Sequence, residues 1–142
     1  MIILDANILL YAYDSTSDLH AKARAWIESV FSGLEPVGIP WQTVSAFVRI
    51  MTNTRLPGEC FTTEEAVLLV DDWLAQPNVR LLAPGEHHWA LFRQMMVDGQ
   101  ASGELVTDAA LAAVTVEYGG MLNTTDRDFA RFLGLRWTNP LA

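Results

Sequence analysis

Five short apolar runs, separated by longer stretches of helical periodicity, constrain this chain more than any other feature of its sequence. Each run is three or four residues long, and the first, Ile2-Ile3-Leu4, lacks polar alternation, which is typical of a strand buried on both faces of a sheet. The runs lie near residues 2–4, 37–39, 79–82, 121–123 and 135–137. Because helix-length stretches connect them, we expect an α/β fold, a three-layer sandwich whose mainly parallel five-stranded sheet is flanked by helices.

The stretches between the runs have apolar residues three and four positions apart, as amphipathic helices do. We expect helices over about 6–13, 18–32, 41–52, 63–76, 86–97 and 105–118, with Asp18 capping the second and Gly119 and Gly120 ending the last. No linker rich in Pro, Gly or Ser interrupts the 142 residues, and 51% of them are apolar. The sequence therefore predicts one domain over residues 1–142 with a sizeable core.

Composition narrows the classes of function. The net charge of −8 argues against broad, charge-driven binding to DNA or membranes, although a local group of arginines can still hold RNA. Cys60 is the only cysteine, which excludes an intrachain disulfide and a cysteine-based zinc site. No basic leader precedes Asp5 and no apolar run approaches the roughly 20 residues that span a bilayer, so we expect a cytoplasmic protein without a membrane segment.

Four acidic residues fall where parallel sheets bind their ligands. Asp5 follows the first apolar run, and Asp126 and Asp128 follow the fourth. Asp108 lies in the first turn of the helix that leads into the fourth run. Ligands of open parallel sheets bind at the carboxyl ends of the strands, so these acids converge if the first and fourth strands are neighbours at the point where the winding direction changes. The alternative is that Asp5 caps a helix, Asp108 stabilises a helix dipole and the others are solvated.

A divalent cation would make such a cluster of acids tolerable. Uncompensated carboxylates within a few Å repel one another and raise one another's pKa values. Mg²⁺ and Mn²⁺ are hard cations that take oxygen ligands, Mg²⁺ at about 2.1 Å, and keep several waters. Such an ion suits phosphodiester hydrolysis, because it polarises the phosphate and lowers the pKa of a bound water.

Three stretches of the chain resemble the signature blocks of the PIN-domain family. They are residues 1–12 (MIILDANILLYA), 106–113 (VTDAALAA) and 125–129 (TDRDF), in this order and spacing. The resemblance is closest to the VapC toxins of bacterial toxin–antitoxin pairs. Within these it favours the mycobacterial-type branch, which also has segments like Ile39-Pro40-Trp41 and Leu135-Arg136-Trp137.

This resemblance implies a PIN-like sandwich with Mg²⁺- or Mn²⁺-dependent endoribonuclease activity on RNA, inhibition by a cognate VapB-type antitoxin, and a homodimer. It assigns Asp5, Asp108 and Asp126 as catalytic metal ligands, and Asp128 as a supporting or structural acid. Many relatives carry a further Glu at the position that aligns with Ala46. The number of metal ions, one or two, therefore stays open.

Three further residues are candidates for the same site. Glu104 lies four residues before Asp108 and is either a replacement for the missing acid, through a water-mediated metal contact, or an exposed acid near a helix N-terminus. Arg49 and Arg127 are candidates for binding the RNA substrate.

Two hypotheses of function follow from these residues. In the first the protein is an RNA-cleaving toxin. In the second it keeps the fold but acts as a binding module with a weakened metal site. In both, we expect an amphipathic antitoxin helix to dock on an apolar face formed by Trp41, Phe47, Met51 and Trp73.

Overall fold

The computed structural model describes residues 1–142, in which short strands alternate with helices. The strands are β1 (Ile2–Leu4), β2 (Val37–Pro40), β3 (Val79–Leu82), β4 (Met121–Asn123) and β5 (Trp137–Thr138). The helices are α1 (Ala6–Tyr13), α2 (His20–Phe31), α3 (Trp41–Met51), α4 (Thr63–Leu74), α5 (His88–Asp98), α6 (Leu105–Glu117) and the 3₁₀ helix η1 (Arg127–Arg131). None of these helices combines the length and the apolar character that crossing a bilayer requires.

All five strands form one parallel sheet in the order β3-β2-β1-β4-β5. The expected neighbourhood of the first and fourth strands is confirmed, since Ile2 pairs with Met121 and Leu4 with Asn123. The last strand begins two residues later than expected. Gly134 has a φ of 83°, and the chain first pairs with β4 at Arg136, whose carbonyl accepts from the Leu122 N–H. Residues 132–135 therefore form a turn, in which the Leu135 N–H donates to the Phe132 carbonyl, before the chain joins the sheet.

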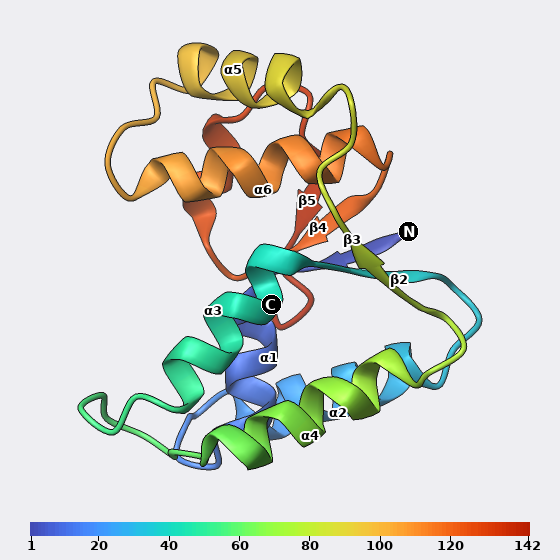
Figure 1. Cartoon of the computed structure of the whole chain (residues 1–142), viewed down its shortest axis with the longest axis vertical. Helices are drawn as coiled ribbons and strands as arrows, with labels where there is room; N and C mark the ends of the chain where they lie inside the picture. Colours follow the sequence, from blue (N-terminus) through green and yellow to red (C-terminus); the bar gives the residue numbers. More distant parts are fainter.

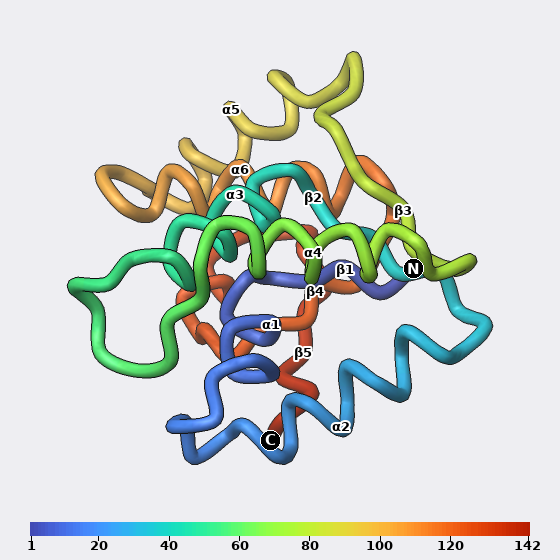
Figure 2. Tube along the Cα trace, turned by 60° about the horizontal axis from the view of Figure 1, so that its bottom comes forward, coloured from blue at the N-terminus to red at the C-terminus, as the bar shows by residue number.

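Helices cover both faces of the sheet, which confirms the three-layer sandwich. Figure 1 shows α5 and α6 on one side and α1 to α4 on the other. Successive residues of β1 point to opposite faces, so that Leu4 packs in the core beneath α1–α4 and Ile3 packs in the core beneath α5 and α6. In the turned view of Figure 2, β1 and β4 run next to each other in the middle of the molecule.

The apolar face expected to receive an antitoxin helix is mostly buried in the protein's own core. Phe47, Met51 and Trp73 are each at most 3% exposed, and only Trp41, at 53%, is open to solvent. The ring of Trp73 lies 4.6 Å from that of Phe47, and its indole N–H donates to the Tyr13 hydroxyl at 2.8 Å. The prediction that an antitoxin helix docks on this face is therefore wrong, because α4 packs on α3 and covers it.

The predicted Gly-Gly stop ends α6 through a specific hydrogen-bond pattern. The Gly119 N–H donates to the Val116 carbonyl and the Gly120 N–H to the Thr115 carbonyl, which together form a Schellman motif. Gly119 has a φ of 65°, a conformation that other residues adopt only at a cost. The expectation for α2 was wrong, because its N-cap is Leu19, without a side-chain cap, and not Asp18.

Candidate active site

The acids meet at the carboxyl ends of β1 and β4. Asp5 follows β1, Asp126 is the N-cap of η1 after β4, and Asp108 lies in the first turn of α6. Carboxylate oxygens of Asp108, Asp126 and Asp128 lie within 4.8 Å of one another. The backbone joins the two strand ends directly, since the Asp5 N–H donates to the Asn123 carbonyl at 3.1 Å.

Asp5 lies beside this group of three and is fixed by its own hydrogen bonds. Its Oδ1 accepts from the Ala6 N–H at 2.7 Å, so the predicted capping of α1 occurs. Its Oδ2 accepts from the Thr124 hydroxyl at 2.7 Å. Asp5 also lines the pocket in front of Asp108. Capping a helix and facing the ligand crevice are therefore compatible roles for one carboxylate.

Thr124 is buried and links the two strand ends through its side chain. Its hydroxyl donates to Asp5 and accepts from the backbone N–H of Asp126 at 3.0 Å and from the Asn7 amide at 3.2 Å. Nearby, Oδ1 of Asn7 is buried without a hydrogen-bond partner, which leaves an unused oxygen acceptor next to the acids. These two residues lie at the site, and the only signal for Thr124 in the sequence is the polar pair Thr124 and Thr125 between a buried strand and an acid.

Burial and the mutual repulsion of the acids raise the pKa values of Asp108 and Asp5. Burial, followed by the charges of Asp126, Asp5 and Asp128, raises the pKa of Asp108 from 3.8 to about 6. Burial also raises the pKa of Asp5, against the hydrogen bonds from Thr124 and Ala6 that lower it. Arg131 lowers the pKa of Asp108, so it is the one cation with a resolved effect on the cluster.

The acids fit a hard divalent cation. Ligand oxygens on opposite sides of a Mg²⁺ ion are about 4.2 Å apart, close to the separations within the group of Asp108, Asp126 and Asp128. All the donors are carboxylate oxygens, and a cation among them would remove the repulsion that raises the pKa of Asp108. The group would therefore hold Mg²⁺ or Mn²⁺ rather than a soft metal.

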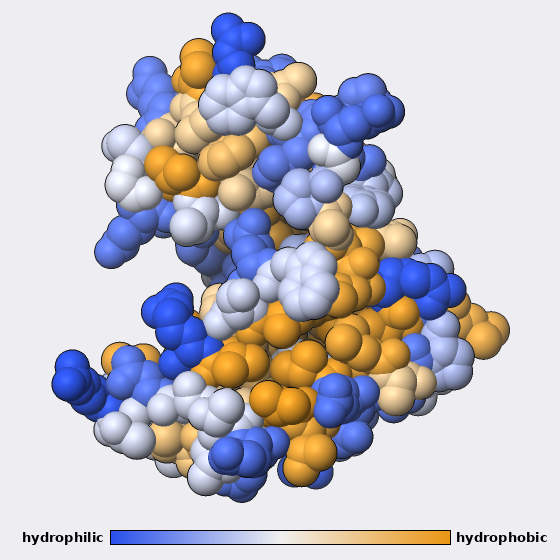
Figure 3. All heavy atoms as spheres, in the orientation of Figure 1, coloured by the Kyte–Doolittle hydropathy of each residue, from blue (hydrophilic) through white to orange (hydrophobic).

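A pocket of about 370 Å³ opens in front of Asp5 and Asp108. Its opposite wall is one face of α3, formed by residues with i, i+3, i+4, i+7 spacing: Gln42, Ser45, Ala46 and Arg49. The Gln42 amide donates to the Thr107 carbonyl at 3.0 Å, which ties α3 to the first turn of α6. Figure 3 shows the surface hollowed between α6 and α3, with hydrophilic side chains at the rim.

The other candidate residues differ in their position relative to this pocket. Arg49 and Ala46 line it, whereas Glu104 and Arg127 are not among its lining residues. Glu104 is exposed at the N-cap of α6, and it does not belong to the group of three acids. Asp128, expected as a supporting acid, is instead one of the three carboxylates that lie together.

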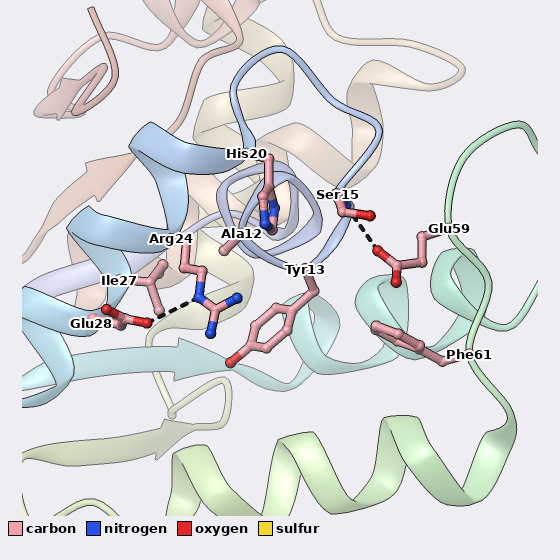
Figure 4. A pocket seen from close by; sticks show the side chains of 9 residues that line it. All are labelled: Ala12, Tyr13, Ser15, His20, Arg24, Ile27, Glu28, Glu59 and Phe61. Atoms are coloured by element: carbon pink, nitrogen blue, oxygen red, sulfur yellow. Dashed lines mark hydrogen bonds and ion pairs between the residues drawn. The ribbon is translucent and has the colours of Figure 1, made fainter.

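A second pocket, of about 300 Å³, lies between α1, α2 and the segment before α4 and shares no residue with the first. In Figure 4 Arg24 reaches toward Glu28, to which it donates at 3.1 Å, and Glu59 accepts from the Ser15 N–H. These charged groups thus already have partners within the protein. No cluster of acids like that at β1 and β4 lies here, so the first pocket is the candidate active site.

Comparisons with known proteins give a family match that spans most of the chain. The family model for the PIN domain matches residues 2–134. Ribonuclease VapC43 of Mycobacterium tuberculosis is 39% identical over 141 residues, which cover 99% of this chain and 96% of that protein. Ribonuclease VapC37 of the same species is 39% identical over 142 residues, covering 100% of this chain and 99% of the relative.

Solved structures share the fold at lower sequence identity. VapBC2 from Rickettsia felis, bound to a promoter DNA fragment, matches with a TM-score of 0.73 at 15% identity, covering 98% of each chain. VapC20 of M. tuberculosis, a sarcin–ricin-loop-cleaving toxin, matches with a TM-score of 0.69 at 17% identity, covering 96% of this chain and 99% of that one. A toxin–antitoxin complex from Klebsiella pneumoniae matches with a TM-score of 0.66 at 14% identity, covering 99% of this chain and 98% of the other.

Proposed function

Because this chain belongs to the PIN-domain family, among the VapC ribonucleases, we propose that it is a toxin that hydrolyses RNA phosphodiester bonds with a divalent cation, Mg²⁺ or Mn²⁺. One observation carries the proposal for the site. Carboxylates of Asp108, Asp126 and Asp128, from helix α6 and from the end of β4, come within 4.8 Å of one another beside a pocket. Sites of this kind hold a metal for hydrolysis.

The roles of the residues follow from their positions. The cation, when bound, polarises the phosphate and lowers the pKa of a bound water. Asp108, Asp126 and Asp128 would hold it, and its positive charge would offset the repulsion among these carboxylates. Asp5, fixed by Thr124 and facing the pocket, would be a further ligand of the same cation from the end of β1. Arg49 and Arg127 bind phosphates of the RNA strand.

Two substitutions test this function directly. We expect Asp5→Asn and Asp108→Asn each to abolish Mg²⁺-dependent cleavage of purified RNA. The chain should stay folded, because each substitution removes a charge from a cluster of acids that repel one another. The matched control is Asp71→Asn, the same change at an exposed acid of α4. If helical circular dichroism were lost together with activity in Asp5→Asn, capping of α1 would explain the effect and the proposal for Asp5 would fail.

The second candidate function is a binding module. It is supported by the α3 side of the pocket, which has Ala46 and no carboxylate opposite Asp5 and Asp108. A chain with that role would bind RNA or the antitoxin without cleaving. An assay with antitoxin-free protein over a range of Mg²⁺ concentrations separates the two, since only the enzyme produces metal-dependent fragments.

We propose two protein partners as well. A VapB-type antitoxin is supported by the solved neighbours that are toxin–antitoxin complexes. A second copy of the chain is supported by the apolar surface that Figure 3 shows over α3 and α4 and beside β2 and β3. On α4, Val67 and Leu68 are 47% and 63% exposed. Exposed apolar patches often mark the surfaces through which proteins associate, including copies of the same chain.

A further inference from the structure

The two walls of the active-site pocket carry opposite charges. Asp5 and Asp108 lie on one wall, and carboxylates of Asp126 and Asp128 lie within 4.8 Å of that of Asp108. On the α3 wall, Arg49 is the only charged residue. None of the four ion pairs of the chain involves Arg49, so its guanidinium is not neutralised by a carboxylate.

This asymmetry bears on how many cations the site can hold. Two divalent cations in one phosphodiesterase site lie about 4 Å apart and need carboxylates around both. On the α3 wall a second cation would meet only the neutral side chains of Gln42, Ser45 and Ala46, and it would be repelled by Arg49. Only the side of the pocket with Asp5 and Asp108 therefore has enough carboxylates to bind a divalent cation.

A guanidinium is well suited to the place of the second cation. Its planar N–H groups bind two oxygens of a phosphate at once, and its charge does not depend on pH near neutrality. Arg49 lies two helical turns after Gln42, whose hydrogen bond to the Thr107 carbonyl holds the two walls together. The pocket between Arg49 and Asp108 therefore has a cation-binding wall and an anion-binding wall.

We propose that the site works with one divalent cation and that Arg49 supplies the second positive charge by gripping the non-bridging oxygens of the scissile phosphate. The inference rests on the proposed ribonuclease function and specifies its metal count and its phosphate-binding residue. It also explains why Ala46 is compatible with activity, because an acid at that position would pair with Arg49 one turn later.

Counting metal ions is the first test. We expect isothermal titration of the metal-free wild-type chain with Mn²⁺ to give one site per chain. Arg49→Gln should leave both this number and the Mn²⁺ affinity unchanged, because Arg49 contacts the phosphate and not the metal. Two Mn²⁺ ions bound to a wild-type chain that cleaves RNA would overturn the inference and leave the proposed function standing.

Steady-state cleavage is the second test. We expect Arg49→Gln to lower kcat/KM for a single-stranded RNA by about 100-fold, as is typical when one donor to a developing anion is lost, and Arg49→Lys to recover part of it. Arg93→Gln, the same change at an exposed arginine of α5, should have no effect. Unchanged cleavage by a folded Arg49→Gln chain would overturn the inference, whereas a wild-type chain that cleaves no RNA would overturn the proposed function.

Discussion

At the scale of single residues, the Thr124 hydroxyl joins the two halves of the site. It makes hydrogen bonds with the Asp5 carboxylate, the Asp126 backbone and the Asn7 amide, and it is fully buried. Side chains that orient metal ligands commonly affect metal affinity as strongly as some ligands do. Thr124 is therefore a positioning residue rather than a ligand.

Thr124→Val keeps the shape of this side chain and removes its hydrogen bonds. We expect the free energy of unfolding to fall by about 1–3 kcal/mol, because buried partners are left unsatisfied, and the Mn²⁺ affinity to fall about 10- to 100-fold. Chemical denaturation and calorimetric titration measure the two effects. Thr124→Ser, which keeps the hydroxyl, is the control. A Val variant with lower stability but unchanged Mn²⁺ affinity would show that the contact only supports the fold.

The raised pKa of Asp108 predicts how the metal-free protein responds to pH. The pKa of this group is about 6 in the folded chain and near 3.8 when exposed, so its ionisation opposes folding at pH 7. Replacing it by Asn should raise the free energy of unfolding at pH 7 by about 1 kcal/mol, after allowance for solvent that reaches the carboxylate. The gain should shrink as the pH falls from 6 towards 4 and vanish only below about pH 3, where the wild-type group is protonated in both states. A gain that is constant from pH 4 to pH 8, measured in the absence of divalent ions, would contradict this assignment.

At the scale of elements, the end of α6 sets where β4 begins. Gly119 adopts a left-handed conformation, and no atom outside its chain neighbours lies within 4 Å of a Cβ added there. Gly119→Ala therefore tests backbone conformation without a clash. We expect it to destabilise the fold by about 1–2 kcal/mol, and Gly119→Asn by clearly less, because Asn tolerates this conformation. Equal losses for Ala and Asn in thermal denaturation would argue against this explanation.

The elements differ in how well their sequences predict them. The buried runs at 2–4 and 121–123 became β1 and β4, because a strand covered on both faces needs no polar alternation. The convergence of acids followed from that topology. The sequence did not predict the role of Thr124, since two threonines after a strand have no pattern that distinguishes one of them. It also did not predict that the chain's own core covers the apolar face of Phe47 and Trp73, because that depends on how α4 packs on α3.

At the scale of the whole molecule, the exposed apolar surface over α4 predicts self-association. Leu68→Glu should convert a homodimer to a monomer, because it places a charge in an apolar interface. Light scattering after size-exclusion chromatography gives the mass of each species. Val97→Glu, at a residue of α5 that is 69% exposed, is the matched control and should leave the dimer intact. A wild-type chain that is monomeric at high micromolar concentration would refute this prediction.

The position of β1 between β2 and β4 has a consequence for the synthesis of the protein. The ribosome makes β1 first, yet one of its two neighbours is among the last segments to emerge, and the Asp5–Thr124 hydrogen bond spans 119 positions. A growing chain carries Asp5 long before Asp108, Asp126 and Asp128 exist to hold a metal. Folding of such long-range contacts waits for the late segment. With the proposed function, we therefore expect an unfinished chain to lack a complete active site and to cleave no RNA until translation is nearly complete.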